Sequence, residues 1–378
     1  MKWSPGFSTT TRRSQAIGLR RCRRSGLAFV LGLVGLWWGS CWAQQIETRP
    51  AGVYTNPRTW LVDFSWKGVA KPSTQPEEGA RAGKEGQSCR LLVWISRPRS
   101  WDEQWAHEPR WQGARPALTF VDPHHGNLID AWVKEIGLAG DSLIIRRSML
   151  ITSFEVTYAI DPEQVGSYDR RSELVRRYTR SEDGIQAGGQ VRRLAREAVG
   201  EERNPYLCAR LLFRWIVANM SYADKVERYD VREALSTGSG DSALLAMLFV
   251  AMCRAVDIPA RIVCGHYTTG DRGAHVWAEF YLPNYGWVPA DPAAAERASP
   301  SQASESVLKR YFAHLDNERI IVSKGTNILL WPRVRGRWLR NFGLEPSGTS
   351  RLMVISDFAL EGVAGKVRHS YTWSFEER

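Results

Sequence analysis

The sequence predicts an α+β protein, in which a β-sandwich-like N-terminal domain precedes a core made of one buried helix packed on an antiparallel sheet. Three observations support this fold class. Residues 44–178 contain short runs in which β-branched and aromatic residues alternate with period two. Residues 243–256 are apolar on nearly every side of a helix, which is typical of a central, buried helix. Strand-like segments joined by a tight turn follow that helix.

The first 43 residues are predicted to be a cleaved signal peptide. Seven basic residues and no acidic ones accompany the charge-free run Leu27–Trp38, which is short for a membrane span. Small residues at Cys41 and Ala43 suit signal peptidase, so we expect cleavage after Ala43 and an exported protein, either periplasmic or secreted. An uncleaved anchor helix is the alternative interpretation. Lipidation of Cys41 is a poor fit, because a tryptophan stands three residues before it. We expect no membrane span after cleavage.

Composition and charge exclude several classes of protein. The chain has 378 residues, 43% hydrophobic and 24% charged, which rules out a collagen-like, coiled-coil or wholly disordered chain and suggests about two domains. Seven of the 51 basic residues lie in residues 1–43, so residues 44–378 carry 44 basic against 40 acidic residues. This small excess is not a polyanion-binding surface, and no nucleic-acid partner is expected.

Four cysteines remain once the signal peptide is removed, namely Cys89, Cys208, Cys253 and Cys264. None forms a CxxC motif or stands beside paired histidines, so we expect neither a disulfide framework nor a metal site. Cys208 and Cys253 fall on apolar helical faces and are interpreted as buried, unreactive thiols. The pairing of Cys89 and the oligomeric state stay open.

The N-terminal domain, residues 44–178, is predicted to be β-rich and sandwich-like, with strands in three segments. These are Trp60–Trp66, Arg90–Ile95 and Ser153–Ile160. The Gly-, Pro- and charge-rich stretch Lys71–Gly86 separates the first two and is predicted to be a mobile loop. The many tryptophans of this domain are interpreted as the core and rim of a sandwich, with a ligand-binding face as the alternative.

The core, residues 179–300, changes to the helical period. Helices are predicted over 190–200 and from Pro205, where Asn204 is a suitable N-cap and proline is tolerated at the first helical position. The buried helix follows Gly238–Ser242 and ends at Pro259. The strands expected after it are Ala260–Tyr267, Ala274–Tyr281 and Trp287–Asp291.

Residues 301–378 are predicted to be a C-terminal β extension that completes the core. A polar linker, Ser299–Ser306, leads to a helical piece near Leu308–Leu315. The strands expected to extend the core sheet are Ile320–Val322, Asn327–Trp331 and Arg351–Ile355.

A series of motifs runs through residues 205–292. In order, it contains Gly240-Asp-Ser242, Cys253-Arg-Ala-Val-Asp-Ile-Pro-Ala-Arg261, Ala274-His-Val-Trp-Ala-Glu279 and Tyr285-Gly-Trp-Val-Pro-Ala-Asp291. A series of this length and order carries more information than any short motif. It resembles the core of the transglutaminase-like superfamily. The resemblance implies a papain-like fold, acyl transfer or amide hydrolysis on a protein or peptide substrate, and a mechanism that needs no cofactor or metal.

The resemblance also implies a catalytic constellation. In the family, a cysteine at the start of the buried helix is the nucleophile, a histidine on a following strand is the base, and an aspartate orients that histidine. His275 and Asp291 match the last two positions, on adjacent predicted strands, whereas Ser242 stands where the family has cysteine. A helix N-terminus can favour a thiolate, but it cannot ionise a serine at neutral pH. Ser242 would therefore lose its proton to His275 only during attack.

Two functions remain open from the sequence. Retention of His275 and Asp291 favours an enzyme, whereas Ser242 favours a catalytically inactive binding or scaffolding module of the cell envelope. The alternative, non-catalytic roles are a surface histidine for His275, a turn-forming aspartate for Asp291 and a helix cap for Ser242. Tyr222 and Trp277 are candidate residues of a substrate cleft, although packing beside the site is the favoured role for Trp277. The acyl donor and acceptor are not predicted.

Overall fold

The computed structural model describes residues 52–72, 89–136, 141–270, 273–300, 302, 304–332, 349–350, 356–361 and 365–378. The predicted signal peptide with Cys41 and its cleavage site, most of the predicted loop Lys71–Gly86, and the expected strand Arg351–Ile355 lie outside the described residues. Contacts group Glu47–Arg378 into one compact unit. In the part of the chain that is described, no helix is long and apolar enough to cross a membrane.

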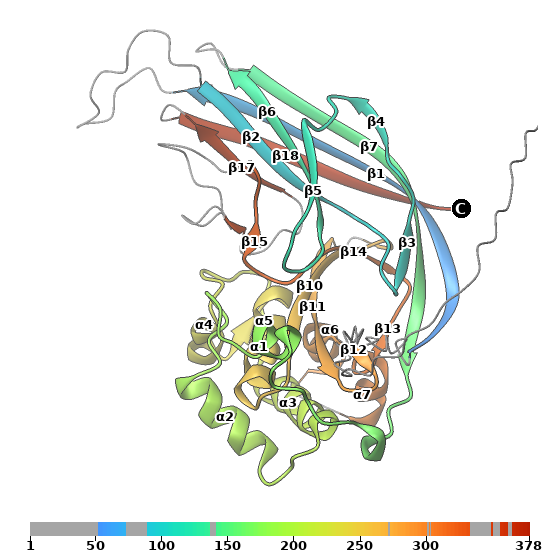
Figure 1. Cartoon of the computed structure of the whole chain (residues 1–378), viewed down its shortest axis with the longest axis vertical. Helices are drawn as coiled ribbons and strands as arrows, with labels where there is room; N and C mark the ends of the chain where they lie inside the picture. Colours follow the sequence, from blue (N-terminus) through green and yellow to red (C-terminus); the bar gives the residue numbers. More distant parts are fainter. Residues whose placement is uncertain are drawn as a thin grey trace, which may run out of the picture. The chain divides into compact units, whose positions relative to one another are not determined.

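Two antiparallel sheets form a sandwich at the top of Figure 1. One has the strand order β13-β7-β1-β18, with β3 and β4 also paired to β7, and the other has the order β17-β2-β6-β5. Their bounds are β1 Gly52–Pro72, β2 Cys89–Arg97, β3 Gln104–Ala106, β4 Arg110–Gly113, β5 Leu118–Val121, β6 Leu128–Ile136, β7 Asp141–Tyr158, β13 His314–Leu315, β17 Ser356–Glu361 and β18 Gly365–Glu377.

The inner face of β1 packs against two different partners. Its buried side chains alternate with exposed ones, as the period-two pattern predicts. Phe64 and Trp66 join the apolar cluster between the two sandwich sheets. Trp60 and Val62, nearer the start of the strand, join a cluster with residues of β14 (Arg319–Lys324), a strand of the core. One long sheet therefore covers both the second sandwich sheet and the edge of the core.

The core is an antiparallel sheet, in the order β12-β11-β10-β14, with α5 packed against it. Every residue of Ala243–Ala255 in α5 is buried, which confirms the predicted central helix. The sheet strands are β10 Ala260–Tyr267, β11 Ala274–Leu282 and β12 Gly286–Ala290. The helices are α1 Glu173–Tyr178, α2 Gly189–Val199, α3 Pro205–Asn219, α4 Val231–Thr237, α5 Ser242–Ala255, α6 Pro292–Ala298 and α7 Glu305–Tyr311, and α2, α3, α4 and α6 contact α5.

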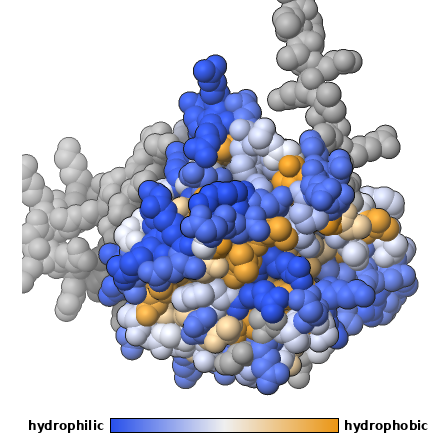
Figure 2. Space-filling model, turned by 90° about the horizontal axis from the view of Figure 1, so that it is seen from below, coloured by the Kyte–Doolittle hydropathy of each residue, from blue (hydrophilic) through white to orange (hydrophobic). Residues whose placement is uncertain are grey.

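The short elements are the 3₁₀ turn Pro162–Gln164, β8 Ser221–Tyr222, β9 Ser239–Gly240, β15 Ile328–Leu329 and β16 Thr349–Ser350. The helical end of the unit is seen from below in Figure 2, where hydrophilic residues alternate with smaller apolar areas. The α+β class with a sheet-rich N-terminal part is thus confirmed.

The C-terminal strands differ from the expectation that residues 301–378 complete the core. Of the expected strands, Ile320–Val322 lies within β14, which joins the core sheet by pairing with β10. The expected strand Asn327–Trp331 contains β15, which pairs with β16 outside the core sheet. In contrast, β17 pairs with β2 and β18 pairs with β1, so both belong to the sandwich. The reason is that β1 and β2 each offer a free strand edge, which β18 and β17 pair and cover.

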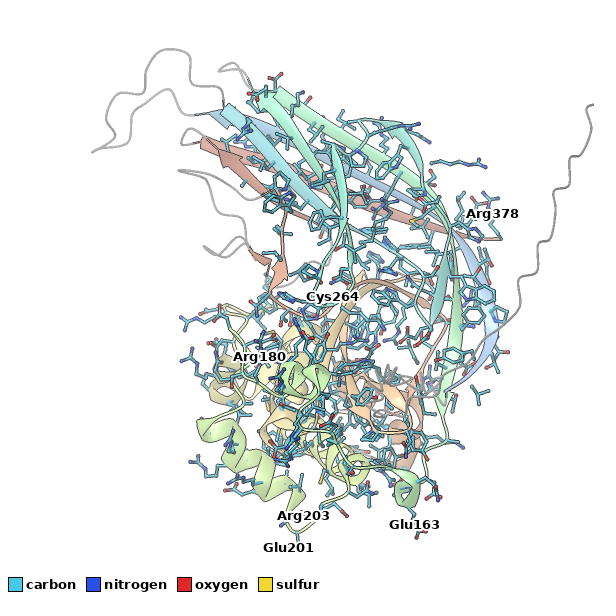
Figure 3. All side chains as sticks on the ribbon, in the orientation of Figure 1. Glu163, Arg180, Glu201, Arg203, Cys264 and Arg378 are labelled. Carbon is cyan, nitrogen blue, oxygen red and sulfur yellow. The ribbon has the colours of Figure 1, made fainter. Side chains whose placement is uncertain are left out.

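A buried ionic cluster lies where the core sheet meets the sandwich. Lys324 Nζ donates hydrogen bonds to Glu103 Oε1 at 2.9 Å and to Glu279 Oε1 at 2.8 Å. Arg261 Nε donates to Glu279 Oε2 at 2.7 Å. Burial raises the pKa of Glu103, and the nearby Glu279 carboxylate adds to that rise. Two cations between two carboxylates keep this interior close to neutral. Cys264 is labelled near this junction in Figure 3.

Candidate active site

Ser242 is the first residue of α5 and is held by the turn that precedes the helix. Asp241 is the N-cap, with its Oδ1 accepting a hydrogen bond from the backbone N–H of Leu244 at 2.9 Å. Tyr229 donates its hydroxyl proton to Asp241 Oδ2 at 2.7 Å. The Ser242 Oγ accepts a 3.4 Å hydrogen bond from the backbone N–H of Val276. The hydroxyl therefore lies beside β11, next to the backbone of the residue that follows His275.

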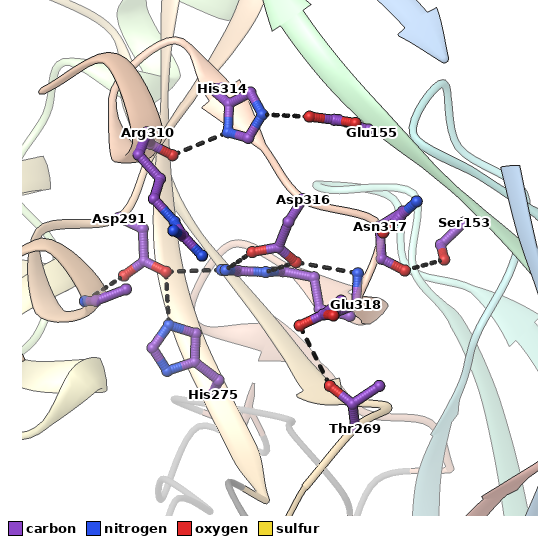
Figure 4. A network of polar contacts seen from close by, with 12 residues as sticks. Ser153, Glu155, Thr269, His275, Asp291, Arg310, His314, Asp316, Asn317 and Glu318 are labelled. Carbon is purple, nitrogen blue, oxygen red and sulfur yellow. Dashed lines mark hydrogen bonds and ion pairs between the residues drawn. The ribbon is translucent and has the colours of Figure 1, made fainter. Parts of the chain in front are cut away.

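His275 is a buried residue of β11, with 4% of its surface exposed. Its Nε2 is 2.7 Å from Asp291 Oδ2 (Figure 4). An ionised carboxylate only accepts hydrogen bonds, so Nε2 is the donor in this contact, and in the neutral tautomer that fits it Nδ1 carries the lone pair. Within the described residues, Nδ1 has no hydrogen-bond partner. Tyr267 packs against the imidazole, with ring centroids 4.8 Å apart.

Asp291 is one residue beyond β12, at the N-cap of α6, rather than on the neighbouring strand as expected. Its Oδ1 accepts a 3.0 Å hydrogen bond from the backbone N–H of Ala294. Its Oδ2 accepts from both His275 and Arg319 Nη1, each at 2.7 Å. Burial alone would raise the pKa of Asp291, but His275 and Arg319 outweigh it and hold that pKa well below its usual range. The carboxylate is therefore ionised and fixed in place.

Arg319 is a member of the site that sequence reasoning missed. It comes from β14, and its buried guanidinium bridges Asp291 and Asp316, with Nε 3.1 Å from Asp316 Oδ1. Burial disfavours its charge, but Asp316 and Asp291 raise the pKa of Arg319 above its ordinary value. The spacing Asp316-Asn-Glu-Arg319 directly before an apolar strand was the available signal, because a charged residue on such a strand requires a buried partner.

The two candidate cleft residues have different environments. Tyr222 is half-buried and pairs with Gly240, so it borders the turn before Ser242. The guanidinium of Arg297 lies 4.6 Å from the centre of its ring. Trp277 is 0% exposed, and Arg319 lies 5.3 Å from its ring centre. The indole of Trp277 therefore supports His275 and Arg319 from the interior, and it does not line the cleft in this structure.

No described cysteine is placed to replace Ser242. Cys208, Cys253 and Cys264 are free and buried. Burial raises the pKa of Cys264 to about 12 and that of Cys208 to about 11, and it raises the pKa of Cys253 well above its ordinary value. Each raised pKa keeps the cysteine in its thiol form, whereas the nucleophilic form is the thiolate. Among the described residues, no group of three or more His, Cys, Asp and Glu side chains is arranged to hold a metal ion.

A cleft of about 880 Å³ opens beside His275. Tyr267, His275 and Arg319 are among its lining residues. One wall is formed by α6 and α7, and the other by β7 and residues 314–318. His275 thus contributes to the lining of the cleft, whereas Ser242 is not among its lining residues.

Comparisons with known proteins agree with the motif series. The sequence model of the transglutaminase-like superfamily matches residues 192–292. An uncharacterized protein of Haemophilus influenzae is 28% identical, and the match covers 45% of this chain and 55% of that protein. This chain thus spans about half the length of that relative.

Solved structures show how far the likeness of the fold extends. The crystal structure of a candidate cysteine protease from Cytophaga hutchinsonii is similar, with a TM-score of 0.57, 12% identity, and coverage of 86% of this chain and 92% of that chain. The periplasmic domain of TgpA from Pseudomonas aeruginosa is 18% identical over 63% of this chain and 91% of that domain, with a TM-score of 0.31. Residues 192–292 therefore match the core of the transglutaminase-like superfamily, and the fold of the chain is similar to that of the Cytophaga hutchinsonii protein.

Proposed function

We propose that this chain catalyses acyl transfer or amide hydrolysis on a protein or peptide substrate, with Ser242 as nucleophile, His275 as general base and acid, and Asp291 as the orienting carboxylate. The main support for this proposal is the 2.7 Å hydrogen bond between His275 Nε2 and the ionised Asp291, because it leaves Nδ1 as the basic nitrogen. The contact of Ser242 Oγ with the N–H of Val276 supports a short path from the hydroxyl to that nitrogen.

The mechanism follows from these positions. Ser242 Oγ attacks the carbonyl carbon of an amide while its proton passes to His275 Nδ1, and the resulting imidazolium is stabilised by Asp291. The N-terminus of α5 presents N–H groups and a partial positive charge to the developing oxyanion. His275 then protonates the leaving amine, which breaks the C–N bond and leaves an acyl-serine. Water or a second amine attacks that ester, with His275 again taking a proton.

A catalytically inactive binding module is the second candidate function. Among the described residues, Ser242 Oγ is hydrogen-bonded to a backbone N–H and not to the imidazole of His275. A serine in this position also lacks the thiolate that a helix N-terminus can stabilise. Both observations favour a site that has kept the geometry of the family without its chemistry.

Covalent labelling distinguishes the two functions. The mature protein is treated with a fluorophosphonate and mapped by peptide mass spectrometry, and a Ser242→Cys variant is alkylated with iodoacetamide across pH. We expect an adduct on Ser242 that is lost in His275→Ala. The matched control for the thiol is Ser236→Cys, because Ser236 is an exposed residue of α4 outside the site. Absence of an adduct on Ser242, together with a fast thiol in Ser242→Cys, would establish a silenced site and refute catalysis by the native serine.

We also propose that the mature protein acts outside the cytoplasm. The proposal is supported by the basic, then apolar, then small-residue order of residues 1–43. N-terminal sequencing of protein expressed from the full chain should begin at Gln44. A protein that retains Met1 in the membrane fraction would contradict cleavage and favour the anchor.

A further inference from the structure

The two walls of the cleft beside His275 differ in charge. Arg297 of α6, with Lys309 and Arg310 of α7, lies on one wall, and all three side chains are exposed. Among the described residues, none of these three cations has a carboxylate partner. Arg297 instead lies over the ring of Tyr222, and Arg310 lies 5.6 Å from the ring centre of Tyr311.

The carboxylates of the opposite wall are already paired. Glu155 accepts hydrogen bonds from Asn56 at 2.6 Å and from His314 Nε2 at 3.0 Å. Asp316 is bonded to Arg319, and Glu318 is within 3.3 Å of Arg58 and 3.2 Å of Thr269 (Figure 4). Each of these carboxylates already has a hydrogen-bond partner, whereas the three cations of the α6–α7 wall have no carboxylate partner among the described residues. The cations that are free to bind an added anion therefore lie on the α6–α7 wall.

The cationic wall adjoins the reacting groups. Figure 4 shows the Arg310 side chain extending toward the space between Asp291 and Asp316. His275 lines the same cleft as the three cations. In the proposed mechanism His275 gives its proton to the leaving amine, so the substrate segment on the amine side of the scissile bond passes this wall.

We propose that the wall formed by Arg297, Lys309 and Arg310 binds acidic side chains of a peptide or protein substrate, on the amine side of the bond that is cleaved or formed. This inference rests on the proposed function for its position relative to the reaction. Guanidinium groups bind carboxylates through paired hydrogen bonds, and a wall of unpaired cations concentrates anionic segments. In transamidation, the same wall would receive an acceptor amine flanked by acidic residues.

Peptide binding tests the recognition without requiring catalysis. Two acetylated hexapeptides, one with three Glu and one with Gln at the same positions, carry an uncharged dye, and their binding to wild type is followed by fluorescence anisotropy. We expect the Glu peptide to bind about tenfold more tightly at low salt, and this preference to fall as ionic strength rises. The preference should fall to about twofold or less in the triple variant Arg297→Gln, Lys309→Gln, Arg310→Gln.

Alkylation tests the position of the wall relative to the nucleophile. In Ser242→Cys, the ratio of the rates with iodoacetate and iodoacetamide reports attraction of a carboxylate to the site. The triple substitution should lower this ratio about fivefold, whereas Arg193→Gln should leave it unchanged. Arg193 is an exposed residue of α2, a helix far from α7 in Figure 1.

The outcomes separate the two proposals. Equal binding of the two peptides, or a preference that survives the triple substitution, would overturn acidic recognition. A thiol in Ser242→Cys that reacts no faster than the one in Ser236→Cys would refute an activated site, while a Glu preference carried by the three cations would still support the binding wall. An unchanged alkylation ratio with a lost peptide preference would overturn the placement beside the reacting groups.

Discussion

Removal of the Arg319 guanidinium, which lies at the centre of the site, should strongly lower the free energy of unfolding. In Arg319→Met, Asp291 loses one of its partners and Asp316 loses its ion pair, while both carboxylates keep their positions. Breaking a buried ion pair from one side costs about 3–5 kcal/mol, because the remaining charge stays buried. That is a large part of the ~5–15 kcal/mol by which folded domains are stable.

Urea unfolding followed by tryptophan fluorescence measures this loss. With a urea dependence of about 3 kcal/mol per molar, the unfolding midpoint should fall by about 1–2 M. The control is Arg58→Met, because Arg58 forms ion pairs with Glu318 and Glu377 that are partly exposed and should contribute less than about 1 kcal/mol. Adding Asp316→Asn to Arg319→Met should recover part of the loss.

The pH dependence provides the refuting test. Burial opposes ionisation of Asp291 and Asp316, but their cationic partners hold both pKa values below the ordinary range. A depressed pKa in the folded state contributes stability above the unfolded pKa of about 4, and that stability is lost as the pH falls below it. The difference between wild type and Arg319→Met should therefore narrow below about pH 4. Equal midpoints for Arg319→Met and Arg58→Met at pH 7, or a difference that widens in acid, would refute the reasoning.

Three further outcomes are expected from other parts of the site. Asp241→Ala removes the N-cap of α5, so the free energy of unfolding in urea should fall by about 1 kcal/mol and fluorophosphonate labelling of Ser242 should slow. An unchanged labelling rate would show that the cap does not position Ser242. Gly265→Ala would place a methyl group 2.1 Å from a backbone oxygen of β14, so we expect the free energy of unfolding to fall by more than about 3 kcal/mol or the protein to be insoluble. The control is Gly188→Ala, which should leave stability unchanged because no atom lies within 4 Å of the added methyl group. Cys208 and Cys264 should not react with a thiol reagent at pH 8 until urea unfolds the protein. Rapid reaction in the native state would show that these two thiols are accessible to solvent.

The parts of the fold that follow from local pattern were predictable from the sequence. Residues 243–255 are apolar all round, and β10 and β11 are bounded by turn residues, so helix and strands occur where expected. His275 and Asp291 were found through the order of motifs, and their 2.7 Å contact agrees with adjacent positions. The structure differs from the prediction in one respect: Asp291 caps helix α6 and does not face His275 across neighbouring strands of the sheet.

Long-range partners were not predictable, since a period-two pattern identifies a strand without identifying its neighbour. The C-terminal strands were expected at the core sheet, yet β17 and β18 complete the sandwich. The same limit explains Arg319. Its charge on an apolar strand indicates a buried partner, but nothing in residues 315–325 indicates that the partner is the carboxylate of Asp291.

The pairing of β1 with β18 has a consequence for the order in which the protein can fold. Arg58 of β1 is bonded to Glu377 of β18 across 319 positions of chain. One edge of β1 therefore stays unpaired during synthesis until β18, about 300 positions later, has been made. Contacts between such distant residues form slowly, because a long loop must close first. If the chain crosses a membrane from its N-terminus, β1 crosses before β18 is present on the same side. The pairing of these two strands can then form only after β18 has also crossed.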